Sequence, residues 1–421
     1  MSFRLAVATT VLTLGVAAWD ARSSAPARPT YAQHVRPILQ TGCVPCHREG
    51  EAAPFSLEGY EAAKKWASMT VRVTESRQMP PWLSADKGRF HDERRLSEVD
   101  IATLRNWEAT GAPEGHAYSA VPALPPKTRG GWPLGKPDAV IRLEQPYRVK
   151  EAGPEIYRYF VFENPYDEVK WLRAIHPRPG NPGVVHHMSV MTDASGDATR
   201  WDRSHRDGQP GYTSMGGSRF RPSGVMGVWA PGAEVRPFPA ETAMALRPHD
   251  RIVVLVHYSP SGKEEVDQWQ LGLYLTSEPK REIRMGAVEA QEISIPAGKK
   301  DHRVTAAISV PEDITLLGVI PHLHALGAKF KGSVVNEQGE RTGLIDIPAW
   351  DPAWQTAYWY REPVRVAQGS RMEIEGIFDN SAENPRNPSN PPKRVKLGEA
   401  STEEMCNLIF MYTVDVPVSR G

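Results

Sequence analysis

The most distinctive chemistry in this sequence lies in the run Cys43-Val44-Pro45-Cys46-His47. Two thiols three positions apart can form thioethers to a porphyrin, and the adjacent His47 is then placed under the iron as an axial ligand. A structural zinc site would need two further ligands at matching spacing, and a redox dithiol has no use for the histidine. The run therefore predicts a covalently attached c-type haem.

The second axial ligand of this haem is predicted to be Met79, in the run Gln78-Met79-Pro80-Pro81-Trp82. The prolines stiffen the chain directly after the thioether and would present it on a defined loop. A soft sulfur donor favours reduced iron, which suits electron transfer. A methionine of the core is the structural alternative, and His91 and Met69 compete as ligands.

Soft and imidazole donors recur later in the chain, at His186-His187-Met188, His257, His322-Leu323-His324 and Met405. Neighbouring residues of a regular strand point to opposite faces, so His186 and His187 could reach one metal only at a strand end or a bulge. His322 and His324 would share a face of a strand and form a chelating pair. Taken singly, each has another explanation: a hydrogen-bonded structural histidine for His257, a core methionine for Met405. The combination is more specific than its parts.

Helices are expected to carry the haem residues. Apolar residues recur at helical spacing in Tyr31 to Leu39 and in Ser97 to Trp107. Ser97 with Asp100 is typical of a helix start, and Gly111 ends the second segment. Residues 28–118, with their haem run, resemble a monohaem cytochrome c domain.

The chain then changes character. Residues 119–139 are rich in Pro and Gly and predict a linker. Beyond it, short apolar and β-branched runs between turns predict strands and β-sandwich architecture. These runs are 252–258, 271–275, 304–310, 314–320, 372–378 and 408–414. The expected fold is multidomain, with a small all-α domain followed by all-β domains at 140–280 and 281–421.

Residues 1–25 read as a signal peptide. Arg4 supplies a positive start, and the apolar run Leu5 to Ala18 is too short to span a bilayer comfortably. Cleavage is expected after Ala18 or near Ala25, and an uncleaved N-terminal membrane anchor is the alternative. Either reading predicts bacterial export to the periplasm or beyond, where covalent haem attachment also occurs. No membrane span is expected after signal removal. The net charge of zero, without a basic block, argues against a nucleic-acid partner.

From about residue 140 onward the chain resembles the copper type II, ascorbate-dependent monooxygenases, such as peptidylglycine α-hydroxylating monooxygenase and dopamine β-hydroxylase. The matching pieces occur in family order: His186-His187-Met188, Trp229-Ala230-Pro231-Gly232, Val256-His257-Tyr258, His322-Leu323-His324 and Glu404-Met405-Cys406-Asn407-Leu408. The resemblance implies two jelly-roll sandwiches with one copper each. It assigns His186, His187 and His257 to the first copper, and His322, His324 and Met405 to the catalytic second copper.

The sequence departs from this family in four places. Ile320 stands where the peptide-amidating enzymes carry an arginine that grips the substrate carboxylate, and Ile409 stands where they carry a tyrosine. These two losses argue against a C-terminal glycine-extended peptide as the substrate. Cys406 lacks its usual disulfide partner, so it is expected to be a buried small residue. The fourth departure is the haem domain itself.

The expected function is an exported oxidoreductase that hydroxylates a C–H bond of a small molecule or peptide with O₂. Two copper ions and one haem c are its expected cofactors. Electrons would come from ascorbate or another external donor, or from a periplasmic electron-donor protein through the fused haem. Two alternatives remain open: a non-catalytic copper and haem protein for electron transfer or redox sensing, and a copper–haem reductase of a small nitrogen oxide.

Overall fold

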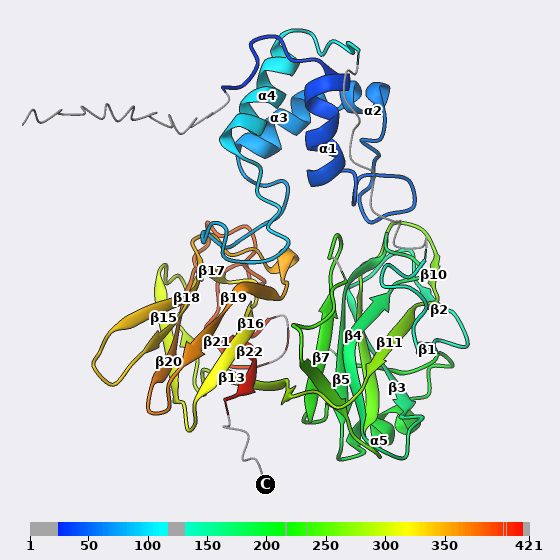
Figure 1. Cartoon of the computed structure of the whole chain (residues 1–421), viewed down its shortest axis with the longest axis vertical. Coiled ribbons are helices and arrows are strands. Elements are labelled where there is room, and N and C mark those ends of the chain that lie inside the picture. Colours follow the sequence, from blue (N-terminus) through cyan, green and yellow to red (C-terminus); the bar gives the residue numbers. More distant parts are fainter. Residues whose placement is uncertain are drawn as a thin grey trace, which may run out of the picture.

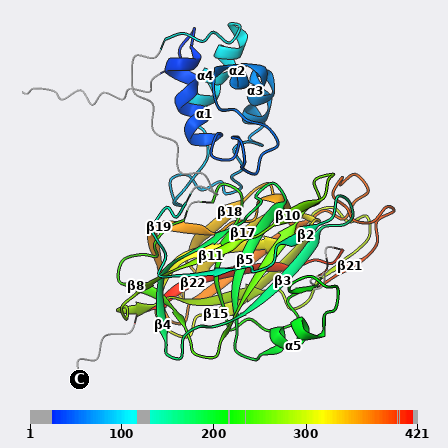
Figure 2. The same ribbon diagram turned by 90° about the vertical axis from the view of Figure 1, so that its right-hand side faces the viewer.

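The computed structural model describes residues 24–116, 131–214, 217–233, 235–398, 400 and 402–415. A helical part lies at one end, and two β-rich parts lie side by side below it (Figure 1). In a view turned by 90° the helical part again stands apart, while the two β parts overlap (Figure 2). Most of the predicted signal peptide and residues 119–130 of the predicted linker lie outside the described residues. None of the described helices has the length and apolar character needed to cross a bilayer.

The helical part packs around Val35, Leu104 and Trp107, which are almost fully buried. The capping box predicted at Ser97 is present: the Ser97 hydroxyl accepts from the Asp100 N–H, and the Asp100 carboxylate accepts from the Ser97 N–H. The helices are η1 (Tyr31–Val35), α1 (Arg36–Gly42), α2 (Tyr60–Lys65), α3 (Ala67–Glu75) and α4 (Glu98–Ala109). The start of the first predicted helix is thus a π-turn rather than α-helix.

The first β part holds two five-stranded sheets, ordered β6-β3-β9-β5-β7 and β1-β11-β4-β8-β12, with the small pair β10-β2. Fully buried residues such as Val254, Trp269 and Leu271 form its core. Its elements are β1 (Ala139–Arg142), β2 (Tyr147–Val149), β3 (Ile156–Glu163), β4 (Lys170–Arg178), β5 (Val185–Asp193), α5 (Asp197–Ser204), β6 (Tyr212–Thr213), β7 (Gly224–Trp229), β8 (Thr242–Leu246), β9 (Arg251–Tyr258), β10 (Glu265–Asp267), β11 (Gln270–Thr276) and β12 (Arg281–Glu282).

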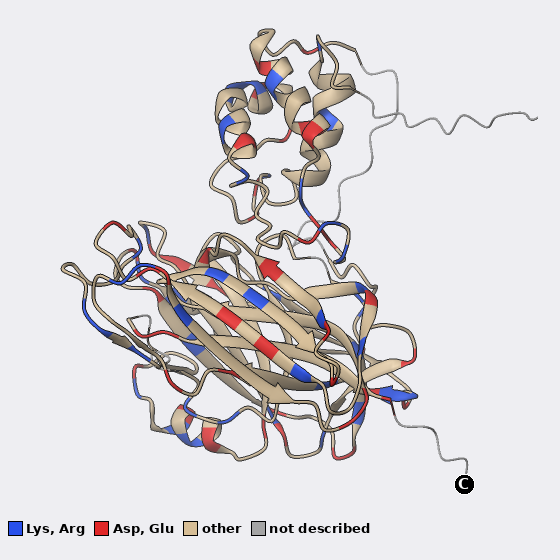
Figure 3. Ribbon diagram, turned by 90° about the vertical axis from the view of Figure 1, so that its left-hand side faces the viewer, with Lys and Arg blue, Asp and Glu red and all other residues tan. Residues whose placement is uncertain are grey.

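The second β part holds two four-stranded sheets, β13-β22-β16-β19 and β15-β20-β17-β18, with the pair β14-β21. Its strands are β13 (Arg284–Glu289), β14 (Ser294–Ile295), β15 (His302–Ser309), β16 (Ile314–Leu323), β17 (Gly327–Val335), β18 (Arg341–Ile347), β19 (Tyr358–Val366), β20 (Arg371–Phe378), β21 (Val395–Lys396) and β22 (Cys406–Val414), with the 3-10 turn η2 (Pro352–Trp354) before β19. Alternating charges cover the outer face of the sheet that contains β20, for example Arg303 with Glu375 (Figure 3).

All six predicted strand runs are strands, and the β-rich body is compatible with the predicted sandwiches. Short apolar and β-branched runs between turns were sufficient to find them, since strands such as β9 and β16 are buried at nearly every position. The cytochrome c identity of the helical part and the jelly-roll connectivity stay predictions.

The two β parts share an apolar interface. Leu317, Ile320 and Met411 belong to strands of the second part, yet they pack into the core cluster of the first. On this interface β16 pairs with β22, and Ile320 lies opposite Ile409. The face of β16 that carries Ile320 therefore looks toward the first β part.

Residues 80–96, here called the docking loop, join the helical part to both β parts. Phe90 is fully buried in the core of the second part and forms a β-bridge with Tyr360. On the other side, the Asp92 carboxylate pairs with the Arg236 guanidinium of the first part. The docking loop therefore contacts both β parts, so the helical part is attached by packing and an ion pair and not by a linker alone.

We expect Phe90→Ala to lower the free energy of unfolding of the second β part by about 3–5 kcal/mol, because it removes a fully buried aromatic ring from a packed core. Denaturant unfolding monitored by circular dichroism measures the change. Leu397→Ala is the matched control, since Leu397 is 37% exposed and its loss should change stability by less than about 0.5 kcal/mol. Equal effects of the two substitutions would contradict a core role for Phe90.

Candidate metal centres and haem site

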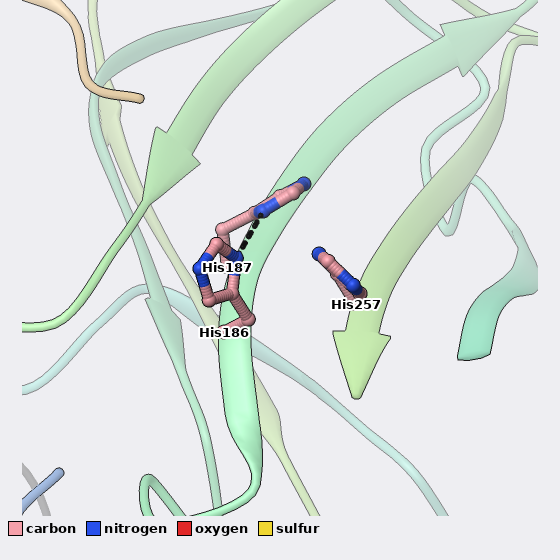
Figure 4. A group of neighbouring side chains, drawn as sticks. All are labelled: His186, His187 and His257. Atoms are coloured by element: carbon pink, nitrogen blue, oxygen red, sulfur yellow. Dashed lines mark hydrogen bonds between the residues drawn. The ribbon is translucent and has the colours of Figure 1, made fainter. Parts of the chain in front are cut away.

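The first cluster of histidines forms where β5 and β9 pair. His187 lies opposite His257, and the register between the strands shifts at Val185 and His187, leaving His186 in a bulge. This is the irregularity that the sequence argument required. Ligand atoms of the three imidazoles all lie within 4.8 Å of one another, so the rings converge on one point (Figure 4).

Two neighbours orient His257. Its Nε2 lies 3.0 Å from the carboxylate of Glu155, and its ring stacks on Tyr157 with 4.1 Å between centroids. The buried Nδ1 of His257 has no hydrogen-bond partner among the described residues. A carboxylate on one ring nitrogen and an unpartnered second nitrogen is the usual environment of a metal-binding histidine.

Burial favours the neutral form of His186 and His187. It lowers the pKa of His186, and it lowers that of His187 well below its ordinary value, where the neighbouring histidines add to the effect. Neutral imidazole is the form that binds metal ions, because each ring then offers one free lone pair. The cluster fits a cation that prefers three nitrogen donors, such as copper.

The second cluster lies at the end of β16. The Nδ1–H of His324 donates to the Glu403 carbonyl, and the Nδ1–H of His322 donates to the side-chain oxygen of Gln355. Each neutral ring therefore carries its lone pair on Nε2, yet the two Nε2 atoms are only 3.2 Å apart. Two acceptors facing each other at this distance repel unless a cation lies between or beside them. Burial and the neighbouring His324 lower the pKa of His322 to about 4.

Met405 lies at the same end of the sheet as this cluster. In the β16–β22 ladder His322 lies opposite Asn407 and Leu323 lies opposite Cys406. Met405 directly precedes Cys406, and the carboxylate of the residue before it, Glu404, accepts the N–H of His324. This position makes Met405 the candidate thioether ligand beside His322 and His324.

Glu404, which sequence reasoning missed as a positioning residue, holds the backbone of this cluster. Its buried carboxylate accepts the N–H groups of His324 and Leu326, at 2.9 and 2.6 Å. Burial raises the pKa of Glu404 to about 8. The sequence offered one signal for this role, namely the position of Glu404 beside Met405. Acidic residues next to predicted ligands are too common for this signal to identify a positioning residue.

One segment of the second β part reaches both clusters. In the stretch Asp351–Gln355, here called the bridging loop, Gln355 accepts from His322. The same loop lies against the first cluster: burial lowers the pKa of His186, while Asp351 and the backbone of Ala353 act to raise it. Burial lowers the pKa of His187, and the nearby His322 adds to this effect. The clusters therefore face each other across the interface between the β parts.

The predicted haem residues lie at the end of α1. Cys43 and Cys46 are both free thiols, and the N–H groups of Cys46 and His47 donate to the Cys43 carbonyl in one tight turn. The Nδ1–H of His47 donates to the Phe55 carbonyl at 3.2 Å, which leaves Nε2 for iron. Both thiols and the free ring nitrogen fit covalent haem attachment.

The candidates for the second axial position differ in their surroundings. Met79 is half-buried and follows α3, whereas the sulfur of Met69 is exposed and accepts from Arg72. His91 lies on the docking loop, where its N–H donates to the carbonyl of Trp359 in the second β part. Met79 stays the predicted second axial ligand.

The haem motif lies directly against the first β part. The turn after β7 brings Gly232 so close to Cys46 that an added Cβ would lie 2.8 Å from its Sγ. Beside it, Arg94 of the docking loop donates to the Pro231 carbonyl at 3.2 Å. Strand β7 then leads to Trp229, whose partner in β5 is Met188, the residue after His187. The haem motif thus contacts the turn after β7, and the end of β7 pairs with β5, the strand that carries His187.

Cys406 is fully buried and free, as the sequence predicted. Burial raises the pKa of its thiol to about 12, so it is unreactive. Packing holds this end of β22 without a disulfide.

We expect Glu155→Ala to weaken copper binding at the first cluster by about 10–100-fold, because the carboxylate that orients His257 is lost. Competition with a copper chelator in the full chain measures the affinity. Glu151→Ala is the matched control, since Glu151 is exposed on the same segment. An unchanged affinity in Glu155→Ala would show that His257 needs no carboxylate partner.

Comparisons with known proteins agree with part of this picture. Residues 283–420 match the model of the family described as copper type II ascorbate-dependent monooxygenase, C-terminal domain, which supports a copper monooxygenase-like function. The match includes His322, His324 and Met405. No curated protein matches the chain.

Solved structures add little. The infectious bursal disease virus VP2 subviral particle is 6% identical, with 66% of this chain and 73% of that chain covered at a TM-score of 0.20. The Gt strain of the same virus is 8% identical, with 67% and 81% covered at a TM-score of 0.18. Values this low carry no argument about fold or function.

Proposed function

We propose that the chain is an exported copper-dependent monooxygenase that hydroxylates a C–H bond with O₂ and receives its electrons through a fused c-type haem. The observation that carries this proposal is the pair of unlike histidine clusters on facing β parts. One has three imidazoles, and the other has two imidazoles with Met405 at the same end of the β16–β22 ladder. The family match over residues 283–420 supports the copper assignment of the second cluster.

The clusters divide the work between them. His186, His187 and His257 would hold the first copper, and His322, His324 and Met405 would hold the second. When bound, copper supplies electron storage at the all-imidazole site and O₂ activation at the site whose thioether favours Cu(I). Glu155 and Gln355 fix the ring orientations through His257 and His322, and Glu404 fixes the backbone at His324.

The haem would be attached at Cys43 and Cys46, with His47 and Met79 as axial ligands. The docking loop and the contact of Cys46 with Gly232 support delivery of electrons to the first cluster, because they hold the haem motif against β7. Fusion also raises the effective concentration of the donor. Ascorbate or a periplasmic donor protein would reduce the haem or the copper from outside.

Residues 1–25 would direct export to the periplasm or beyond, either as a cleaved signal peptide or as an N-terminal anchor. Mass measurement of the mature N-terminus distinguishes the two. A start near residue 19 or 26 indicates cleavage, and a chain retained in the membrane fraction with its N-terminus intact indicates an anchor.

Metal content and oxygen consumption test the proposal. The purified chain should contain about two coppers and one haem, from the ligand sets given above. Given reductant, O₂ and a substrate pool, it should consume O₂ coupled to product, and both Met405→Ala and His257→Ala should lose this coupling. Zinc in both sites would sink the copper assignment. Two coppers without O₂ consumption would favour the alternative, a non-catalytic electron-transfer or redox-sensing protein.

A further inference from the structure

A cavity of about 260 Å³ opens between the two β parts. Its inner wall is apolar and comes from both sides. The second β part contributes Ile320, Met285, Met411 and Trp359, and the first contributes Met226 and Trp229. Small-molecule sites commonly have this character, with apolar walls at the junction of two domains.

The cavity continues the face that carries the second histidine cluster. Ile320 lies two residues before His322 on β16, so both side chains leave the strand on the same face. Across the ladder, Met411 lies two residues beyond Ile409, again on this face. A molecule in the cavity would therefore present its near end toward His322.

The opposite wall lies on the inner face of the sheet that carries the first cluster. Trp229, at the end of β7, pairs with Met188 of β5, the residue that follows His187. The cavity thus lies beside strands of both clusters.

The charges around the cavity select against cations, and its apolar inner end selects against any charged group near His322. No Asp or Glu occurs among the described residues that line it, whereas Arg236, Arg361 and His91 do. Arg236 is paired with Asp92 of the docking loop, and Arg361 donates to the Phe90 carbonyl, so these groups gather at the docking-loop end. A cationic amine would meet two guanidinium groups without a carboxylate, and a carboxylate near His322 would meet only apolar side chains.

We infer that this cavity binds the substrate, and that the substrate is a small, uncharged molecule with an apolar body. The inference rests on the proposed function for its chemical consequence, because the bound C–H group must lie near the second cluster. The binding itself depends only on the cavity. Ile320, Met411 and Trp359 are its specificity-determining residues, and Arg236 and Arg361 exclude cations.

Three probes that share a benzene ring test the charge preference. Ethylbenzene, phenethylammonium and phenylacetate are titrated by calorimetry into the full chain, both as purified and after removal of copper. Ethylbenzene should bind in both samples, and each charged probe should bind at least about tenfold more weakly. Tighter binding of either charged probe, or no binding of ethylbenzene, overturns the inference.

Substitutions locate the binding. Ala357→Phe and Ala233→Phe add a ring to the cavity from the second and the first β part. Each should weaken ethylbenzene binding at least about tenfold, since the ring occupies the space of the probe. Val140→Phe is the control, because Val140 lines a separate hollow on the first β part. Unchanged binding in both cavity variants, or an equal loss in the control, overturns the assignment of the site. Thermal unfolding of each variant verifies that it is folded.

The two proposals fail separately. If ethylbenzene binds the copper-free chain but the copper-loaded chain consumes no O₂, the apolar binding site is supported and the monooxygenase proposal is contradicted. If the chain couples O₂ consumption to hydroxylation of a charged substrate, the monooxygenase proposal is supported and the preference for an uncharged, apolar substrate is contradicted.

Discussion

His324→Ala is expected to lower O₂-coupled hydroxylation by at least about 100-fold, a loss of about 3 kcal/mol in transition-state stabilisation. His324 is one of only two imidazoles in the second cluster, and its Nε2 faces that of His322 at 3.2 Å. With alanine in its place, one imidazole and one thioether remain, which is too few donors to hold copper firmly. Copper content should fall from about two to about one per chain. Product formation and O₂ uptake, measured together, check the result.

His302→Ala is the matched control for this substitution. His302 lies on β15 of the same β part, half-buried and outside both clusters. It should retain both coppers and full turnover. If His324→Ala keeps its second copper and its rate, the second cluster is not the catalytic site.

The second large effect is expected from the double substitution Cys43→Ala and Cys46→Ala. Neither thioether can form, so covalent haem should be lost completely and the absorption bands of the haem should disappear. Reduction of copper by a protein donor should fall with it, whereas a small chemical reductant should still reduce copper directly. The measurement compares O₂ uptake with the two kinds of donor.

Cys406→Ala is the control for the general effect of removing a buried thiol. Cys406 is fully buried and lies near the C-terminus, in the second β part and far in sequence from the haem motif. It should keep its haem. In the wild-type chain, stopped-flow absorption should show reduced haem being oxidised when the first cluster holds Cu(II). Full activity of the double variant with a protein donor, or no haem oxidation in the intact chain, would contradict the role of the haem in electron supply.

The sequence predicted what depends on short-range pattern. Apolar and β-branched runs between turns located β9, β16, β20 and β22, and the first two of these strands are buried at nearly every position. The spacing of His322 and His324 placed them on one face, and the adjacent pair His186 and His187 correctly required an irregularity in β5.

What the sequence could not predict are contacts between distant segments. Glu155 meets His257 across 102 residues, and nothing in its own neighbourhood marks it as different from the exposed Glu151. Gln355 likewise reaches His322 from a turn of no recognisable pattern. The docking loop carries apolar residues such as Phe90 in a segment without period, so its burial in another domain left no local trace.

The bridging loop has a thermodynamic consequence. Asp351–Gln355 contacts His322 through Gln355 and lies beside His186 through Ala353, so any ion that orders one cluster also restricts the loop at the other. The entropic cost of ordering that loop then falls on the first copper to bind and not on the second. Each copper should therefore raise the affinity of the chain for the other by the same factor. At limiting copper, the wild-type chain would therefore be found mainly with both coppers or with neither, and rarely with one.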